Sequence, residues 1–250
     1  METLTLLIPN LYGSSSSEAL DSKSDAYQLL KRASRTGQIP AESFNFATQN
    51  ASLYWGDQPF TSGPIYAGAT LCFLFVLGMF LIEKRTKNWL LGGVIITIFI
   101  AWGHNMAFFN YFMFDYFPGF NKFRTVSMAL SITVLLMTLG GILAIQEVFR
   151  QELTKELLKK LAISVGIVGG ICLLVVLMAG SINTAVPSDQ QVGMVGQIWQ
   201  SARQSMMRSD ALRSLVLILL VAGTIYYTLK EKITKTVGML IVGALIVGDL

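Results

Sequence analysis

The sequence has little charge, a single histidine and only two cysteines. Of its 250 residues 14% are charged and 53% are hydrophobic, and the mean hydropathy is +0.56. Soluble domains of this length are less apolar, so the composition excludes a cytosolic enzyme. The net charge of +4 comes from scattered Lys and Arg residues, which excludes a nucleic-acid-binding surface.

The residue patterns of common catalytic and metal sites are also missing. There is no Gly-x-Ser-x-Gly elbow, no glycine-rich phosphate loop and no pair of His or Cys residues at ligand spacing. We therefore predict no metal site and interpret the lone His104 as a hydrogen-bonded residue at a helix end. Cys72 and Cys172 lie in apolar runs, where a thiol acts as a small hydrophobic group, so we expect no disulfide.

Six apolar stretches predict an all-α fold, a polytopic bundle of transmembrane helices with about six spans. They lie at residues 63–82, 88–103, 125–146, 161–180, 211–229 and 236–250. A helix needs about 20 apolar residues to cross the hydrocarbon core of a bilayer. The second stretch is shorter than this, but an aromatic segment extends it.

Positive charge predicts which loops face the cytoplasm. The short loops at residues 83–87, 147–160 and 230–235 hold ten of the 19 Lys and Arg residues. Short cytoplasmic loops collect cations. We therefore place these three loops inside and expect the regions 1–62, 104–124 and 181–210 to be extracytoplasmic, with short interfacial helices in them.

The two ends of the chain predict that it is an internal piece of a longer protein. Residues 1–62 show neither the basic segment nor the long apolar core of a signal peptide. An outward region of that length normally follows an earlier transmembrane helix, and the sixth apolar stretch is still running at Leu250. We expect an extracytoplasmic region over 1–62 and a transmembrane domain over 63–250, truncated at both ends.

The outer segment 104–124 is rich in aromatic residues. It holds nine of the chain's 27 Phe, Tyr and Trp residues, so we expect it to lie in the membrane interface, broken at Pro118-Gly119. Lys122 and Arg124 close the segment. They are either interfacial cations that extend toward water or a phosphate-binding pair, because Arg binds phosphate with two parallel hydrogen bonds. Arg203 and Arg208, in the last outer loop, are secondary candidates for phosphate binding.

A rigid turn precedes the first span, in the sequence Tyr54-Trp55-Gly56-Asp57-Gln58-Pro59. Its aromatic residues fit an interfacial anchor. Asp57 has two interpretations: it caps the following helix, or it accepts a hydrogen bond from a sugar or an amine. On the second interpretation Tyr54, Trp55 and Gln58 support or join the sugar contact.

Three loop segments predict local helices. Residues 25–33 predict a short helix capped by Ser24. Residues 147–160 predict a helical connector, with apolar residues every four positions and a Glu156–Lys160 pair. Residues 192–207 predict a helix in which Trp199 faces lipid or protein.

Three segments carry a resemblance to a known family. They are Leu4-Thr5-Leu6-Leu7-Ile8-Pro9-Asn10, the stretch from Tyr54 to Gly63, and Asp115-Tyr116-Phe117-Pro118-Gly119-Phe120-Asn121-Lys122-Phe123-Arg124-Thr125-Val126-Ser127-Met128. In these segments the chain resembles the YfhO family of large bacterial membrane proteins. The segments occur in the order expected for that family, and the resemblance covers nearly the whole chain. That family looks like the GT-C class of glycosyltransferases, whose polytopic members use a polyprenyl-phosphate sugar on the outer face of the membrane.

The resemblance implies a multi-pass protein of the bacterial cytoplasmic membrane that moves a sugar from a polyprenyl-phosphate donor to a cell-envelope polymer. Lys122 and Arg124 match the family's Lys-Phe-Arg segment, and Asp57 matches its Trp-Gly-Asp-Gln segment. The catalytic acid of GT-C enzymes usually lies in the first outer loop, which this chain follows, so enzyme status stays open. The alternatives are a lipid or polymer transporter or flippase subunit, which the charge-free middles of the spans disfavour, and a noncatalytic scaffold.

Overall fold

The chain is all-helical. The computed structural model describes residues 2–58, 61, 63–122 and 125–250, and within these residues it is 74% helix with no strand, apart from one isolated bridge between Glu18 and Ala51. The chain divides into two compact units. Unit 1 comprises residues 67–170 and 215–250, and unit 2 comprises residues 2–66 and 171–214. Residues 2–58 of the expected extracytoplasmic region thus share a unit with 171–214.

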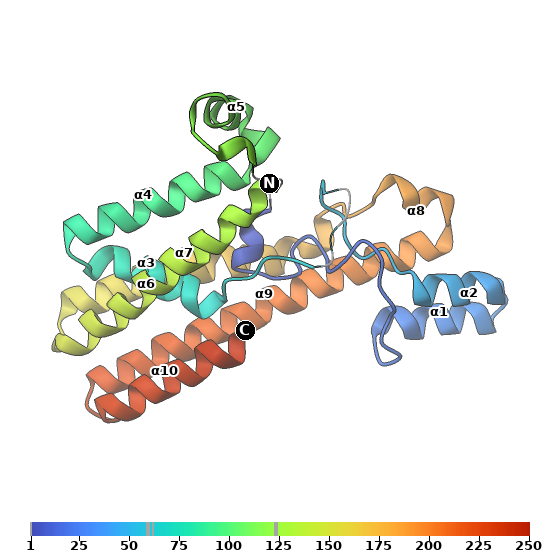
Figure 1. Cartoon of the computed structure of the whole chain (residues 1–250). Helices are drawn as coiled ribbons and strands as arrows, with labels where there is room; N and C mark the ends of the chain where they lie inside the picture. Colours follow the sequence, from blue (N-terminus) through green and yellow to red (C-terminus); the bar gives the residue numbers. More distant parts are fainter. Residues whose placement is uncertain (1, 59–60, 62, 123–124) are drawn as a thin grey trace. The chain divides into compact units, whose positions relative to one another are not determined.

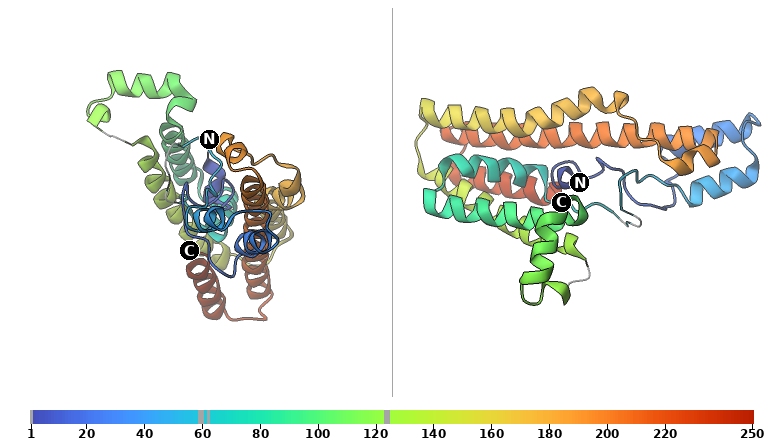
Figure 2. Two further views of the ribbon diagram at one scale, coloured as in Figure 1. Left: turned by 90° about the vertical axis from the view of Figure 1, so that its right-hand side faces the viewer. Right: turned by 90° about the horizontal axis from the view of Figure 1, so that it is seen from above.

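Unit 1 is a bundle of apolar helices (Figures 1 and 2). α3 (Ala69–Leu81) and α4 (Lys84–Ala101) both pack against α6 (Ala129–Arg150). The other members are the first part of α7 (Lys155–Met178), the last part of α9 (Met194–Leu229) and all of α10 (Lys235–Asp249). α3 is the most enclosed, because nine of its 13 residues are buried.

Small residues set the close approach of α3 and α6. A Cβ on Gly78 of α3 would lie 3.0 Å from the Gly140 carbonyl oxygen and 3.2 Å from the Ala144 Cβ. A Cβ on Gly141 would lie 2.9 Å from a methyl carbon of Leu71. Close backbone contact through small residues is the usual interface between helices in lipid, where the hydrophobic effect adds little.

All six apolar stretches contain helix, but not all of these helices are long enough to span a membrane. Three pass by length and hydropathy, over Val126–Arg150, Lys155–Ser181 and Met194–Leu229. A fourth is counted if α4 and the bent segment after it form one span. α3 begins at Ala69 and not at residue 63, because Gly68 has a positive φ of 105° and stands as its N-cap. At 13 residues α3 is about 20 Å long, short of the roughly 30 Å hydrocarbon core.

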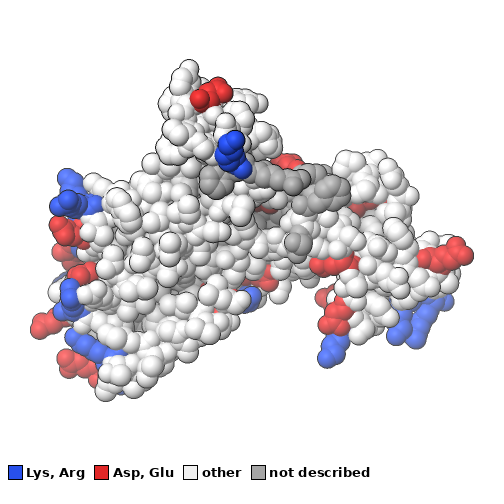
Figure 3. All heavy atoms as spheres, in the orientation of Figure 1, with Lys and Arg blue, Asp and Glu red and all other residues white. Residues whose placement is uncertain are grey.

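The three Lys-rich loops lie together at one end of unit 1. Figure 3 shows the blue and red side chains gathered at the left-hand end of the view, where the α3–α4, α6–α7 and α9–α10 connections lie in Figure 1. One hydrogen bond ties two of these connections together, from Lys235 Nζ to the Phe149 carbonyl oxygen at 2.7 Å. The expected Glu156–Lys160 ion pair is confirmed at 2.8 Å.

The α6–α7 connection differs from our expectation of one continuous helix over 147–160. α6 ends at Arg150 and α7 begins at Lys155, with Gln151 in an extended conformation. The Thr154 hydroxyl accepts a hydrogen bond from the Leu157 N–H at 3.1 Å and so caps α7. The four-residue apolar spacing is therefore shared by the ends of two helices.

At the other end of α4 the chain bends by 117° into an aromatic arm, comprising η2 (Gly103–Met106), α5 (Ala107–Tyr116) and η3 (Phe120–Lys122). Figure 2 shows α5 turned away from the helices of unit 1. The Asn110 amide closes the bend by donating to the carbonyl oxygens of Phe99, Gly103 and Met106 at 2.9, 3.1 and 3.3 Å. These bonds satisfy carbonyls that the end of α4 leaves without helical partners.

Unit 2 is a small helical domain with its own core. Its helices are η1 (Thr3–Leu6), α1 (Asp25–Arg35), α2 (Ala41–Gln49), the last part of α7, η5 (Ala179–Ser181), α8 (Pro187–Gln191) and the first part of α9. Leu30, Ile39, Leu53, Ile198 and Trp199 form the centre of the core. The predicted helix at 25–33 is confirmed, and the Ser24 hydroxyl caps it by accepting from the Tyr27 N–H at 3.3 Å.

Candidate functional site

The turn at residues 54–58 is held by a carboxylate from the start of the chain. The Tyr54 hydroxyl donates to Glu2 Oε1, and Gln58 Nε2 donates to Glu2 Oε2 at 2.8 Å. The Tyr54 oxygen also accepts from the Gln58 N–H at 2.8 Å. A Cβ on Gly56 would collide with the Glu2 carboxylate and the Tyr54 ring, so a larger residue at this position would have to displace these side chains.

Aromatic rings line one side of the turn. The Tyr12 and Trp55 rings lie 5.0 Å apart between centroids, tilted by 35°, and the backbone N–H of Trp55 donates to the Tyr12 carbonyl oxygen at 3.0 Å. Burial, and then the negative charges of Glu2 and Asp57, raise the pKa of Tyr12. Burial and the hydrogen bond to Glu2 raise the pKa of Tyr54 well above its ordinary value. Both phenols therefore stay neutral hydrogen-bonding groups at physiological pH.

Asp57 is exposed at the tip of the turn. The helix-capping interpretation is wrong, because α3 begins twelve residues later and its N-cap is Gly68. A carboxylate held on a rigid turn beside aromatic rings can accept hydrogen bonds from sugar hydroxyls while a ring packs against the apolar face of the sugar. Tyr54 and Gln58 have their polar groups committed to Glu2, so they position the turn, and Asp57 is left as the group open to a ligand.

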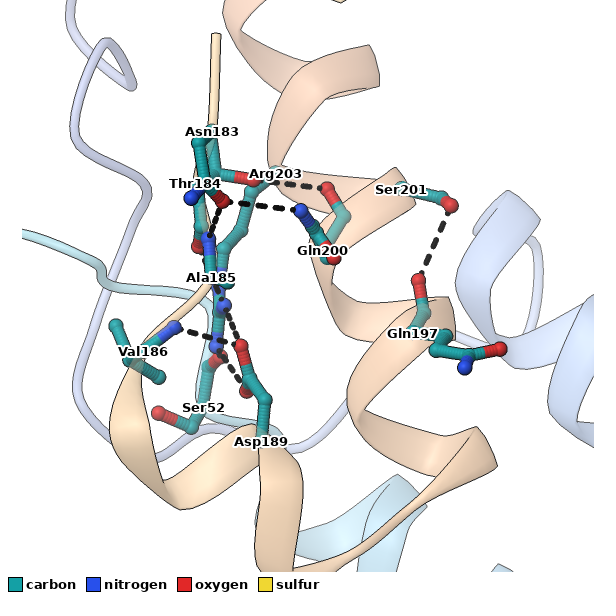
Figure 4. A network of polar contacts seen from close by, with 10 residues as sticks. All are labelled: Ser52, Asn183, Thr184, Ala185, Val186, Asp189, Gln197, Gln200, Ser201 and Arg203. Carbon is teal, nitrogen blue, oxygen red and sulfur yellow. Dashed lines mark hydrogen bonds and ion pairs between the residues drawn. The ribbon is translucent and has the colours of Figure 1, made fainter.

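Arg203 belongs to a buried ion pair (Figure 4). Its Nη1 and Nη2 donate to the two Asp189 carboxylate oxygens at 2.6 and 3.0 Å. The guanidinium also donates to the carbonyl oxygens of Thr184 and Ser52. The side chain is 0% exposed and its nitrogens are all bonded to protein groups. This arrangement leaves Arg203 no nitrogen for a phosphate, so we assign it a structural role in place of the phosphate contact that we expected.

The remaining phosphate candidates lie in different units of the chain. Arg208 is exposed on α9 in unit 2. Lys122 is exposed in unit 1, at the end of η3, where its N–H donates to the Gly119 carbonyl oxygen at 3.0 Å. Arg124 lies outside the described residues. His104 is exposed in η2.

The described part of the chain holds no group of three or more His, Cys, Asp or Glu residues that would bind a metal ion. Cys72 and Cys172 are both buried and do not form a disulfide.

Sequence reasoning missed three partners that define these sites, namely Glu2, Tyr12 and Asp189. Glu2 is 52 residues from Tyr54, and Asp189 is 14 residues from Arg203. No local spacing connects such pairs. One signal was available for the second: Asp189 is one of only two acids in the loop 181–210, which also holds Arg203.

Comparison of the chain with protein-family models, with curated proteins and with solved structures gives no match in any of the three.

Proposed function

We propose that this chain is the membrane-embedded part of a glycosyltransferase that moves a sugar from a polyprenyl phosphate to a cell-envelope acceptor on the outer face of the bacterial cytoplasmic membrane. In this reaction an acceptor hydroxyl oxygen bonds to the anomeric carbon of the sugar, the bond from that carbon to the phosphate oxygen breaks, and the hydroxyl proton passes to a base. Polyprenyl phosphate leaves with the bonding electrons.

One observation carries the proposal, namely that the two ends of α4 differ in chemistry. The Lys-rich connection lies at its start and the aromatic arm at its end. Its 18 residues make α4 about 27 Å long, close to the thickness of the hydrocarbon core. Short cytoplasmic loops of membrane proteins collect cations, and aromatic rings lie at the interfaces between membrane and water. We therefore propose that the Lys-rich loops are cytoplasmic and that Lys122 and the aromatic arm lie at the outer surface.

The exposed residues of the aromatic arm fit a lipid-linked substrate. Phe108, Tyr111 and Tyr116 are 87%, 69% and 75% exposed. Rings in the interface contact both acyl chains and an isoprenoid chain, and Lys122 follows them directly. On this proposal Lys122 and Arg124 stabilise the charge that develops on the departing phosphate, and Asp57 contacts a sugar.

Sidedness is tested by cysteine labelling of intact cells. Cys72 and Cys172 are replaced by Ala, and a single cysteine is placed at position 122 or at position 85. A membrane-impermeant maleimide is expected to label position 122 and not position 85. The reverse pattern would overturn the proposed active face.

Transfer is tested with the double variant Lys122→Gln and Arg124→Gln in the full protein. Membranes are supplied with polyprenyl-phosphate hexoses that carry a radiolabelled sugar, and label is counted in the envelope polymer. Loss of charge stabilisation is expected to lower transfer about 100-fold. The matched control is Lys232→Gln with Arg85→Gln, two exposed cations of the Lys-rich loops. Unchanged transfer at equal protein abundance would remove both residues from the site, whereas no transfer by the wild type favours the scaffold or the flippase alternative.

A further inference from the structure

A groove lined by both apolar and polar residues runs along unit 2 between α1 and the first part of α9. Two adjoining hollows of about 340 and 360 Å³ form it, and both are lined by Asp25, Ala26, Ala202 and Ser205. Toward the end of α9's polar part the groove reaches Asn10, Ser209 and Asp210. In the other direction it reaches Gln28, Arg32 and Ser201. It lies apart from the turn at residues 54–58, and none of the turn's residues lines it.

Three of the serines that line the groove lie on α9, and a fourth, Ser24, is the N-cap of α1. Ser201, Ser205 and Ser209 are spaced by four residues, so they lie in a row on α9 over about 12 Å. The Ser201 hydroxyl donates to the Gln197 carbonyl oxygen at 3.1 Å. Within the described part of the chain, the hydroxyls of Ser205 and Ser209 have no hydrogen-bond partner, and both residues are exposed.

Facing groups complete a mixture of donors and acceptors. Asp25 is exposed at the start of α1, and Arg32 is exposed two turns later. Asp210 is fixed because its Oδ2 accepts from Asn10 Nδ2 at 2.7 Å and from the Asn10 N–H at 3.2 Å. Apolar groups lie between the polar ones, on Leu53 and Met206.

From this lining we infer that the groove binds a neutral saccharide chain. Each sugar hydroxyl both donates and accepts, so it matches a surface on which carboxylates, an arginine and free serine hydroxyls alternate. The C–H face of a sugar ring matches the apolar side chains between them. A phosphate or a uronic acid would be repelled by two carboxylates, and a purely apolar ligand would leave the serine hydroxyls without partners.

The inference rests on the proposed function for the role of the ligand, which would be the acceptor polymer. The apolar part of α9 begins at Ala211, directly after the groove. On the proposed topology a saccharide in the groove is therefore held at the outer membrane surface, where a lipid-linked donor presents its sugar.

Binding is tested with the full protein in lipid nanodiscs. The probes are radiolabelled maltotriose, cellotriose and chitotriose, measured by equilibrium dialysis at millimolar concentration. Ser205→Trp fills the groove and is expected to weaken binding of the favoured trisaccharide at least tenfold. Asp25→Asn removes a charged acceptor from an exposed position without adding bulk, and is expected to weaken binding about threefold.

The matched control is Gln197→Trp, a substitution at an exposed position of α9 outside the groove, which should bind as the wild type does. Failure of all three trisaccharides to bind the wild type would overturn the inference, as would wild-type binding by both groove variants. Transfer separates the two proposals. Groove-dependent binding without any sugar transfer sinks the proposed function alone, whereas normal transfer by Ser205→Trp shows that the groove does not hold the acceptor.

Discussion

The buried Arg203–Asp189 pair makes the sharpest prediction about stability. Replacing Arg203 by Met keeps much of the side-chain volume but removes the guanidinium. The Asp189 carboxylate, 7% exposed, then keeps one described partner, the Val186 N–H at 2.9 Å. The Thr184 and Ser52 carbonyls lose their donor as well. Removing one member of a buried pair costs about 3–5 kcal/mol, so we expect Arg203→Met to destabilise unit 2 by about 4 kcal/mol.

The double variant distinguishes a structural pair from a ligand site. Arg203→Met with Asp189→Leu removes both charges, and the losses that remain are the hydrogen bonds of the Val186 N–H and of the Thr184 and Ser52 carbonyls, about 1 kcal/mol each. We therefore expect the double variant to be more stable than Arg203→Met alone. An arginine that served only to bind phosphate would behave differently, because its positive charge would have no carboxylate partner in the protein. Its removal would leave stability unchanged.

The assay is urea unfolding in detergent, followed by tryptophan fluorescence. Trp55 and Trp199 lie in unit 2, whereas Trp89 and Trp102 lie in unit 1 and are replaced by Phe in every variant. The signal then reports unit 2. A loss below about 0.5 kcal/mol for Arg203→Met, within the range of ordinary surface substitutions, would refute the reasoning. So would additive losses in the double variant.

Three further predictions concern other parts of the chain. Asn110→Leu removes three hydrogen bonds at the bend after α4, so amide hydrogen exchange in the aromatic arm should quicken about tenfold, and an unchanged rate would mean that packing alone holds the bend. The pKa of Tyr54 is raised by burial and by Glu2, so its stabilising contribution is complete below pH of about 10 and is lost as the pH rises above it, because the unfolded phenol ionises first. Tyr54→Phe should therefore flatten the fall of the urea midpoint between pH of about 10 and 11, and an equally steep fall would contradict this cause. Asp249 accepts from the Thr70 N–H and hydroxyl at 2.9 and 2.8 Å. Asp249→Leu removes both bonds and should lower the free energy of thermal unfolding by about 2–3 kcal/mol, whereas Thr70→Val removes only the hydroxyl bond and should lower it by about 1 kcal/mol. Equal losses in the two variants would show that the backbone bond contributes nothing.

The positions of the helices were predictable because each apolar stretch is long and uniform. Helix ends were less so. Gly68 stops α3 from starting earlier through a positive φ, which hydropathy does not register. The break between α6 and α7 was also hidden, because Phe149 and Leu157 keep a helical spacing although they belong to different helices.

Contacts distant in sequence explain why the candidate site was predicted only in part. The turn at residues 54–58 was recognisable from its glycine and aromatic residues. Its partner Glu2 was not, since nothing near Glu2 marks it as a hydrogen-bond acceptor for Tyr54. Arg203 was misassigned for the same reason: a lone arginine in an outer loop has the same local sequence whether it meets a phosphate or Asp189. The interface of α3 and α6 was not predicted, because Gly140 and Ala144 are four residues apart but are not two glycines. They match the general pattern of two small residues and not the more specific Gly-x-x-x-Gly motif.

The location of the buried charged side chains helps to distinguish the proposed sugar transfer from the alternative of a transporter or flippase. Within the described residues the buried charged side chains are Asp189, Arg203 and Asp249. The first two pair with each other in unit 2, outside the apolar stretches, and Asp249 ends α10, where Thr70 of α3 donates to it. A proton or ion pathway needs an ionisable group partway along a span, facing a water-filled cavity. The middles of the six apolar stretches hold no Asp, Glu, Lys or Arg, because Arg213 lies near the start of its stretch and Asp249 near the end of its own, so the charged groups lie outside these stretches or near their ends. That distribution favours reaction at a membrane surface over passage through the membrane.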